Sequence, residues 1–377
     1  MTSKLHTITA VVASCTTAVA LSAVTASSAS AHASGDGPAH SPKVLNNKVI
    51  APFGMSISGQ DVWYTDGFLG TVNKISKGTD TVVTKGPQSE VAGIAVIRGG
   101  NTYAFTSSND DHSATSLTIR SKGRPDVVAD LSGYEKRVNP DKRYTYGVVA
   151  GGKSCAPGEL DAYFMKMGGV PATYRGQVDS HPYAVAYLGD GAWAVADAGG
   201  NDILRVDSRG HVSTIAVLPP QPVTLTAKQV AALGGPSCLA GARFNFEAVP
   251  TDVQRGEDGR LWVSTLPGGP EDPSLGARGS VYTVNPWKHS TNRVATGFLG
   301  ATNLALGDDG AVYVAELFAG KVTRLNHGHR STVVTTARPL SVEVQGDWLY
   351  VGTLADISFG PGAPTVKAPG SITRYHL

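Results

Sequence analysis

The sequence predicts an all-β fold, a single β-propeller of six blades, and three observations support this prediction. Apolar residues alternate over short runs bounded by turn residues, which is typical of strands rather than helices. Copies of one unit recur at a spacing of about 40 residues, the period of a four-stranded blade. The chain contains 45 glycines and 22 prolines and is only 16% charged, which favours many short strands joined by tight turns.

The repeated unit consists of an apolar strand, a turn, an aromatic-rich second strand that ends in a short polar residue, and a third strand. The first copy runs through 55–57, 62–66 and 70–75. A seventh blade would have to lie within 132–180, but that stretch lacks an aromatic second strand, so six blades are predicted. The second strands end at Asp66, Ser107, Asp197, Thr265, Glu316 and Thr353.

Three of these strand ends are acidic: Asp66, Asp197 and Glu316. Each precedes a turn of glycine or other small residues. A carboxylate in that position commonly accepts hydrogen bonds from the N–H groups of the turn. We therefore expect a structural role for these three side chains rather than a catalytic one.

The last repeat ends at Leu377, directly after its third strand, so its outermost strand must come from elsewhere in the chain. Residues 43–49 precede the first blade and resemble the fourth strands at 211–218 and 332–336. Pairing them with the last blade would close the ring and remove an exposed strand edge. The sequence therefore predicts that an N-terminal strand completes the sixth blade.

The N-terminus has the features of a Sec-type signal peptide. Lys4 is the only charged residue before Asp36, residues 8–24 are apolar or small, and Ala29-Ser30-Ala31 forms a cleavage site. We expect cleavage after Ala31, with Ala33 as the alternative. The expected mature protein is secreted. Its domains are a signal peptide (1–31), a flexible N-terminus (32–42) and one propeller (43–377).

The charge and the hydropathy exclude some partners. The formal net charge is +2 for the whole chain, and it falls to +1 when Lys4 leaves with the signal. A nearly neutral surface does not provide the positive field that nucleic acid requires. No second segment has the length of a membrane span. We expect a monomer that contacts neither nucleic acid nor the membrane core.

Two insertions interrupt the repeat, at 132–180 and 219–249, and the second contains a predicted helix at 227–233. Each insertion follows a fourth strand, so both lie on the same face of the propeller. Each carries one cysteine, Cys155 and Cys238. We expect these to form a disulfide, and two free buried thiols are the alternative.

The starts of the inner strands can be aligned as two rings of positions around the axis. We expect the polar members to line a funnel that opens onto the face of the insertions, where a ligand could bind. The structural alternative is a water-filled channel in which Glu90 and Arg338 pair. The polar members are Glu90, His181, Asp252, Asn303 and Arg338, and the other members are Ala51, Val249, Gly300, Gly54, Gly93, Ala184 and Ser341.

Several segments resemble the ScyD/ScyE family of secreted propeller proteins. They include 179–183, the run Asp197-Ala198-Gly199-Gly200-Asn201, and Tyr134-Glu135 followed by Asn139-Pro140-Asp141. The similarity covers nearly all of the mature chain. The departures are His181, where the family has Asn, and a longer connection at 219–249. The resemblance implies the fold and export, but the family carries no agreed biochemical activity.

The function that we expect from the sequence is binding without catalysis. The partner would be a small molecule, a glycan or a component of the cell envelope. The alternative is a metal-dependent hydrolase, lactonase or lyase that acts at the funnel of an NHL or gluconolactonase-like architecture. In gluconolactonase-like propellers a Glu, an Asn and an Asp hold the metal. By position, Glu90, Asp252 and Asn303 could hold Ca²⁺ or Mg²⁺ here, although no cofactor is certain.

Overall fold

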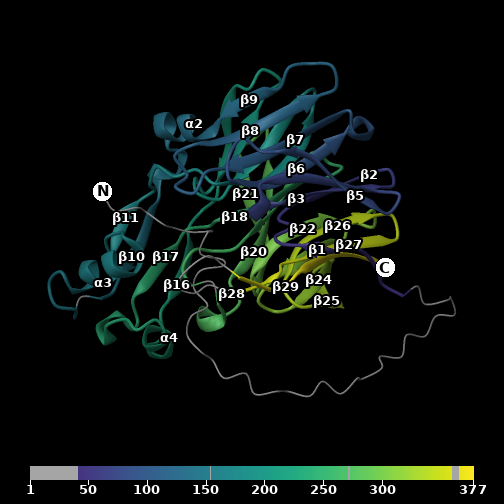
Figure 1. The fold of residues 1–377 in the computed structure, drawn as a ribbon. Helices are drawn as coiled ribbons and strands as arrows, with labels where there is room; N and C mark the ends of the chain where they lie inside the picture. The colour runs from purple at the N-terminus through teal and green to yellow at the C-terminus, as the bar shows by residue number, and fades with distance from the viewer. Residues whose placement is uncertain (1–40, 153, 271, 359–364) are drawn as a thin grey trace.

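The computed structural model describes residues 41–152, 154–270, 272–358 and 365–377. Six four-stranded antiparallel sheets form the blades of a propeller, and a further four-stranded sheet lies beside the ring (Figure 1). The predicted six-bladed all-β fold is confirmed. The predicted signal peptide (1–31) lies outside the described residues, as does most of the predicted flexible segment (32–42).

Each blade consists of four strands, ordered from the inner strand at the axis to the outer strand. Blades 1 to 3 are β2 (Met55–Ser58), β3 (Asp61–Asp66), β4 (Thr71–Ser76) and β5 (Thr79–Lys85); β6 (Glu90–Ile97), β7 (Thr102–Ser108), β8 (Thr115–Ser121) and β9 (Val127–Asp130); and β12 (Pro182–Gly189), β13 (Ala192–Asp197), β14 (Asp202–Val206) and β15 (Val212–Val217). Blades 4 to 6 are β18 (Pro250–Arg255), β19 (Leu261–Thr265), β20 (Gly279–Asn285) and β21 (Ser290–Phe298); β22 (Ala301–Leu306), β23 (Val312–Glu316), β24 (Lys321–Asn326) and β25 (His329–Thr335); and β26 (Pro339–Gln345), β27 (Trp348–Thr353), β30 (Gly370–His376) and β1 (Lys43–Val49). A hairpin of β28 (Asp356–Ser358) and β29 (Thr365–Ala368) extends from blade 6.

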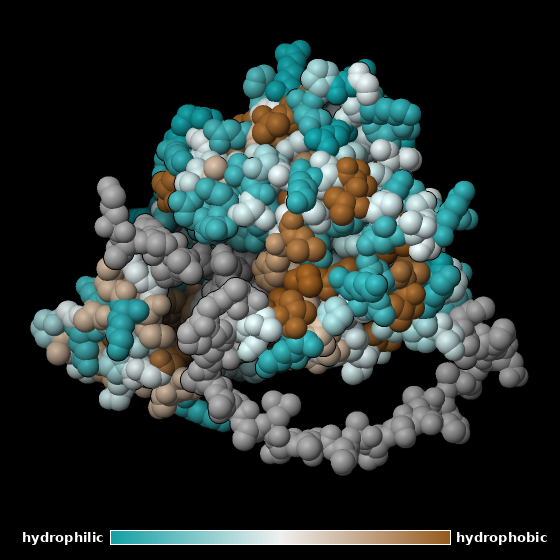
Figure 2. All heavy atoms as spheres, viewed as in Figure 1, coloured by the Kyte–Doolittle hydropathy of each residue, from teal (hydrophilic) through white to brown (hydrophobic). Residues whose placement is uncertain are grey.

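The core lies between neighbouring blades. Every residue of β13 is buried, because both faces of this strand pack against other blades, and its sequence is therefore a nearly continuous apolar run. Between blades 3 and 4, Ala194 and Ile203 pack in one cluster with Val253 and Val263. Hydrophobic side chains also gather near the centre of the face in Figure 2, around the place where Figure 1 draws β18 and β22.

The N-terminal strand closes the ring as predicted. Strand β1 pairs antiparallel with β30, with Lys43 opposite Arg374 and Val49 opposite Gly370. Without β1, the outer edge of blade 6 would present unpaired backbone N–H and C=O groups. Figure 1 shows the two ends of the described chain meeting in this blade.

The acidic residues at the ends of the second strands hold the backbone, as expected. Asp66 accepts hydrogen bonds from the N–H groups of Ile50 (2.8 Å) and Ala51 (3.1 Å). Asp197 accepts one from the N–H of His181 at 2.6 Å. In this way each carboxylate fixes the chain that enters its own blade.

The two insertions fold together into one small unit, which the sequence did not predict. Its sheet has the order β11-β10-β17-β16, so strands of the first insertion pair with strands of the second. The predicted second-insertion helix is confirmed as α4, with Thr226 as its N-cap. The elements of the unit are α2 (Leu131–Val138), η3 (Pro140–Arg143), β10 (Thr145–Ala150), α3 (Glu159–Gly168), β11 (Thr173–Arg175), β16 (Gln221–Thr224), α4 (Ala227–Ala232), η4 (Ser237–Leu239) and β17 (Arg243–Phe246).

A disulfide joins Cys155 to Cys238 and ties the two insertions together, which confirms the predicted bond. Disulfides persist in oxidising compartments, so this one indicates an extracellular or periplasmic protein. None of the helices in the described part of the chain has the length and apolar character needed to cross a membrane.

Candidate functional site

The inner strands approach one another closely at the ring positions aligned from the sequence. A Cβ on Gly93 would lie 2.7 Å from the Cα of Ala184 in the next blade, which is too close for any side chain. A Cβ on Gly54 would lie 2.7 Å from the carbonyl oxygen of Ala92. Glycine is therefore required at these two positions because neighbouring backbones are in contact.

Polar side chains at the same ring position join one inner strand to the next. The Asp252 carboxylate accepts a hydrogen bond from the Leu304 N–H at 3.0 Å. The Asn303 side-chain oxygen accepts one from the Val342 N–H at 2.8 Å. Asp252 and Asn303 therefore hold blades 4, 5 and 6 together, whatever else they do.

A cavity of about 220 Å³ runs along the axis between the inner strands. Asp252, Asn303 and Glu343 line it, and it extends past Gln254 and Arg255 toward the C-terminal ends of the inner strands. The insertions lie at the other end of these strands, since they directly precede β12 and β18. The cavity therefore extends away from the face of the insertions, where the sequence predicted the funnel.

Aromatic rings close the cavity on the side of the insertions. Phe53 and Tyr183 pack with a centroid separation of 5.1 Å, and both line the cavity. They belong to a buried cluster that also contains Leu340 and Leu354. This cluster is called the axial plug below, and it separates the axial cavity from the face of the insertions.

The two carboxyl groups of the cavity favour their protonated forms. Burial raises the pKa of Asp252 to about 7, although the Leu304 and Val253 N–H groups oppose this shift. Burial, and then the charge of Asp252, raises the pKa of Glu343 well above its ordinary value. Gln254 donates a hydrogen bond to Glu343 at 3.0 Å. Perturbed acids in a cavity are typical of functional sites.

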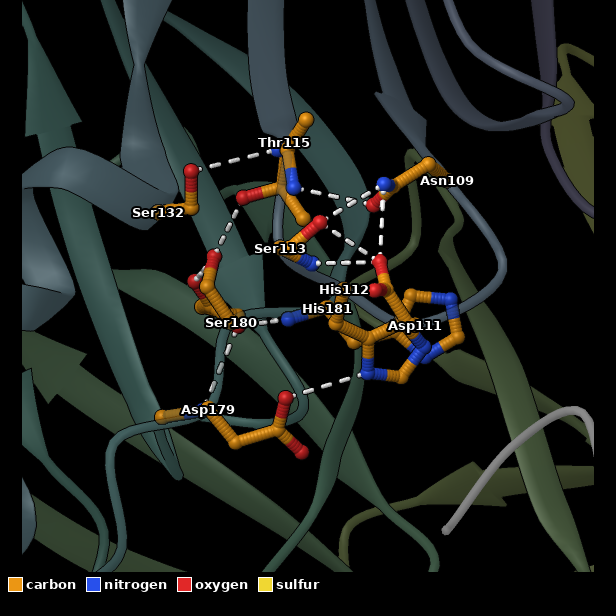
Figure 3. Close-up of polar contacts among 12 residues, drawn as sticks. Asn109, Asp111, His112, Ser113, Thr115, Ser132, Asp179, Ser180 and His181 are labelled. Carbon is orange, nitrogen blue, oxygen red and sulfur yellow. Dashed lines mark hydrogen bonds and ion pairs between the residues drawn. The ribbon is translucent and has the colours of Figure 1, made fainter. Parts of the chain in front are cut away.

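On the other side of the plug, two histidines form a compact group with two carboxylates. His181 Nε2 lies 2.5 Å from Glu90 Oε1, and His112 Nδ1 lies 3.0 Å from Asp179 Oδ1. The two imidazole rings stack with a centroid separation of 4.1 Å. Figure 3 shows how the loop between β7 and β8 brings His112 over His181. The two histidines together with their carboxylate partners Glu90 and Asp179 are called the histidine pair below.

The loop that carries His112 is held in a strained conformation. His112 has a φ of 55°, which is uncommon for a residue other than glycine. Asp111 accepts hydrogen bonds from Asn109 (2.8 Å) and from the Ser113 hydroxyl (2.6 Å), which fix the turn (Figure 3). Strain of this kind, when the surrounding structure holds it in place, often marks a functional site.

The electrostatics of His181 favour its charged form. Burial opposes the charge, but the Glu90 carboxylate outweighs this effect through its charge and its hydrogen bond and raises the pKa of His181. The sequence identified Glu90 and His181 but missed His112 and Asp179. The comparison of inner strands could not find these two, because His112 lies in the loop between β7 and β8, the second and third strands of blade 2.

The five predicted funnel residues do not share one site. Glu90 and His181 lie on one side of the axial plug, whereas Asp252 and Asn303 line the cavity on the other. Arg338 joins neither group: it donates to the Leu354 carbonyl oxygen at 3.2 Å and lies 3.7 Å from Asp356. The pairing of Glu90 with Arg338, considered as the structural alternative, is replaced by the pairing of Glu90 with His181.

The three proposed metal ligands, Glu90, Asp252 and Asn303, do not all line the same cavity. Glu90 does not line the cavity that holds Asp252 and Asn303, whereas Glu343 does. Within the described residues, Cys155, Glu159 and Cys238 bring three potential ligand atoms within 4.8 Å of one another. The two sulfur atoms are bonded to each other, and a metal requires thiolates, so this trio does not fit a metal ion while the disulfide is intact.

No family model and no curated protein matches this chain. Among solved structures, a protein of Thermus thermophilus described as an oxidoreductase (glucose dehydrogenase) is 15% identical, with a TM-score of 0.52, over 89% of this chain and 99% of the other. Another, described as glucose dehydrogenase, is 10% identical, with a TM-score of 0.51, over 90% and 100%. The PQQ-bound aldose sugar dehydrogenase of Streptomyces coelicolor is 15% identical, with a TM-score of 0.49, over 89% and 98%. At 15% and 10% identity, the likeness to the first two structures shows the β-propeller fold alone.

Proposed function

We propose that this chain is an exported propeller of the ScyD/ScyE type that binds a small polar molecule in its axial cavity. The observation that supports this proposal is the presence of two carboxyl groups, Asp252 and Glu343, in one cavity of about 220 Å³. A cavity with a few convergent polar groups and perturbed acids is the general form of a small-molecule site. Binding without catalysis accounts for this arrangement with the fewest further assumptions.

The lining of the cavity favours a compact, hydroxylated ligand. The cavity is smaller than the roughly 300–1,000 Å³ typical of drug-sized ligands. The carboxyl groups of Asp252 and Glu343 disfavour anions, and they can donate or accept hydrogen bonds with hydroxyl groups. The rings of Phe53 and Tyr183 offer an apolar surface at the closed end. A monosaccharide, or the terminal sugar of a glycan, combines hydroxyl groups with an apolar face in this way.

Titration calorimetry with a panel of monosaccharides and polyols tests the proposal. We expect at least one of these compounds to bind the mature protein. We expect Glu343→Gln to weaken that binding tenfold or more, because the side chain lines the cavity. Glu343 accepts a hydrogen bond from the Gln254 side chain, whereas Asp252 also holds the backbone N–H of Leu304 in the next blade. Glu257→Gln, on the exposed surface, is the matched control. Unchanged affinity in both Glu343→Gln and Gln254→Ala would place the ligand elsewhere.

The histidine pair supports a second candidate, a hydrolase or lyase that uses acid–base chemistry on the face of the insertions. A carboxylate that orients an imidazole is the usual arrangement of a general base. His112 Nδ1 is held by Asp179, which leaves Nε2 as the atom that could exchange a proton. Esters and lactones screened against wild type, His112→Gln and the exposed control His211→Gln test this candidate. Turnover that survives in His112→Gln would contradict it.

A further inference from the structure

Trp287 is the most exposed of the large hydrophobic side chains in the described part of the chain, at 67%. It lies in the turn that joins β20 to β21 in blade 4. Tryptophan is usually well buried in a folded protein, because most of its large side chain is apolar. An exposed tryptophan offers a wide, flat surface that a ligand can cover.

The ring of Trp287 also differs from the other four tryptophans in having no stacking partner. Among the described residues, neither an aromatic ring nor a cation stacks on it. Each of the others has neighbours that cover the ring: Trp63 has Lys74, Trp193 has Tyr187, Trp348 has Arg374, and Trp262 packs in the cluster between blades 4 and 5.

The turn holds Trp287 in a fixed position. The Asn285 side-chain oxygen accepts hydrogen bonds from the backbone N–H groups of Trp287 (3.0 Å) and Lys288 (2.9 Å). His289 Nδ1 donates to the Ile215 carbonyl oxygen in blade 3 at 2.7 Å, which anchors the end of the turn. Because the turn is already ordered, little further conformational entropy is lost when a ligand binds.

Trp287 lies at the end of blade 4 where the axial cavity reaches the surface. Arg255 in β18 and Val284 in β20 lie opposite the same residue of β19. The turns that follow β18 and β20 therefore project from the same end of the blade. Arg255 lines the cavity and is itself exposed, so the cavity opens at this end.

The indole ring of Trp287 packs against the turn between β18 and β19. A Cβ on Gly259 in that turn would lie 2.6 Å from the ring, so glycine leaves room for the tryptophan. Gly259 follows Arg255 by four positions, which corresponds to at most about 14 Å. A chain of a few sugars spans such a distance. One extended ligand can therefore contact both Trp287 and the cavity.

The surroundings of Trp287 favour a sugar as the ligand. A sugar ring can pack its apolar face on an aromatic face while its hydroxyl groups bond to polar neighbours. In the adjacent turn, Asp258 and Arg260 are exposed, with Oδ2 and Nε 3.6 Å apart, and they supply an acceptor and donors. A protein partner would require a wider apolar core. In the described turns 256–260 and 286–289, Trp287 is the only exposed large hydrophobic side chain.

We propose that Trp287 stacks on an inner sugar of a glycan whose terminal sugar occupies the axial cavity. This assignment depends on the sugar site proposed above for that cavity. It makes the ligand an oligosaccharide rather than a free monosaccharide. It also gives blade 4 two roles in binding, because Asp252 lines the cavity and Trp287 lies beside its opening.

Titration calorimetry with cello-, chito- and malto-oligosaccharides of one to six sugars tests this arrangement. In at least one series, the affinity of the wild type should rise with chain length. Trp287→Ala should weaken binding of the longest oligosaccharide tenfold or more, since an exposed tryptophan anchor commonly carries much of the binding energy, and should leave the affinity for the monosaccharide unchanged. Trp287→Phe keeps a flat ring and should retain most of the gain. Met167→Ala is the matched control, because Met167 is 59% exposed on α3 at the opposite face, and it should bind as the wild type does.

Fluorescence quenching by acrylamide gives a second readout that does not depend on affinity. Trp287 is the most exposed tryptophan, so most of the quenching of the wild type should come from it. A saturating long oligosaccharide should protect it, whereas a saturating monosaccharide should not. Trp287→Phe should lack this protection. Equal melting temperatures of the wild type and both Trp287 variants show that the variants are folded.

The variants Trp287→Ala and Glu343→Gln separate the two sites. If Glu343→Gln weakens monosaccharide binding but Trp287→Ala binds every oligosaccharide like the wild type, the axial site stands and the role of Trp287 is overturned. The exposed ring would then fit a protein partner instead. If Trp287→Ala weakens oligosaccharide binding but Glu343→Gln does not, Trp287 binds sugar apart from the cavity, and the shared ligand is overturned. A wild type that binds no saccharide overturns both proposals.

Discussion

The Asp252 carboxylate accepts the Leu304 N–H at 3.0 Å, and this single bond connects the inner strands of blades 4 and 5. The second oxygen of the same carboxylate accepts the Val253 N–H at 2.8 Å. Asp252 therefore serves the joint between two blades and lines the axial cavity at the same time. Substitutions at this position test both roles.

Asp252→Ala is expected to destabilise the protein by about 1–3 kcal/mol, because it leaves the buried Leu304 N–H without an acceptor. Asp252→Asn keeps an acceptor oxygen and should preserve that bond. Urea denaturation followed by circular dichroism measures the difference. Glu257→Ala, which is exposed, should change the free energy of unfolding by less than about 0.5 kcal/mol. If Asp252→Ala unfolds like the wild type, the joint does not depend on this bond.

The free energy of unfolding should fall as the pH rises from about 4 to 7, and Asp252 should be one cause. Its pKa is about 7 in the folded protein and about 3.9 in an unfolded chain. In this range the folded state holds a proton that the unfolded state loses, so raising the pH favours unfolding by up to about 4 kcal/mol. Glu343 is the titratable group that faces it from β26, and its own pKa is raised well above the ordinary value by burial and then by the charge of Asp252. Asp252→Asn should flatten the profile, and equal slopes in the two proteins would contradict the assignment.

Glu90→Gln should destabilise the protein more at pH 5.5 than at pH 9. The raised pKa of His181 means that its pairing with Glu90 stabilises the fold fully below about pH 6.5, and that this contribution is lost as the pH rises through the folded pKa. Asp179 and Asp197 also act on His181, and His112 stacks on it. The matched control is Asp207→Asn, whose partner His211 is 75% exposed. Equal effects of Glu90→Gln at both pH values would rule out a charged pair.

Removal of the closing strand should cost several kcal/mol, because the deletion exposes the whole edge of β30 and the apolar residues that β1 covers. A chain that begins at Pro52 is therefore expected to melt well below a chain that begins at Pro42, which keeps β1 intact. Differential scanning calorimetry of the two proteins gives the comparison. Identical melting temperatures would show that the pairing of Lys43 with Arg374 contributes little.

Much of the fold could be predicted because it depends on local periodicity. The second strand at 62–66 and its later copies have a clear alternation, and copies without an insertion between them recur at about 40 residues. The missing outer strand of blade 6 was inferred because the last copy ends directly after its third strand. The disulfide followed from the topology, since both cysteines lie in insertions on one face. The sheet of the insertions was missed, because β10 and β17 belong to segments far apart in the sequence and share no repeat.

The candidate sites were harder to predict than the fold. Alignment of the inner strands shows how far along the propeller axis each residue lies, but it does not show which side chains lie between two such positions. Phe53 and Tyr183 are ordinary apolar positions in the sequence, yet they divide the expected funnel in two. His112 reaches His181 from the loop between β7 and β8, which the alignment did not include. Arg338 has a φ of 50°, a turn conformation that the inner-strand comparison did not reveal.

The disulfide also has a consequence for proteolysis. The bond spans 83 positions, and the segment between Cys155 and Cys238 contains the whole of blade 3, so this blade lies inside a covalently closed ring. A protease that cuts once within the ring opens the backbone but releases no fragment until the bond is reduced. The two pieces of a nicked chain therefore stay in one covalently linked molecule. Because the six blades remain tethered to one another, the propeller can fold again with the cut in place.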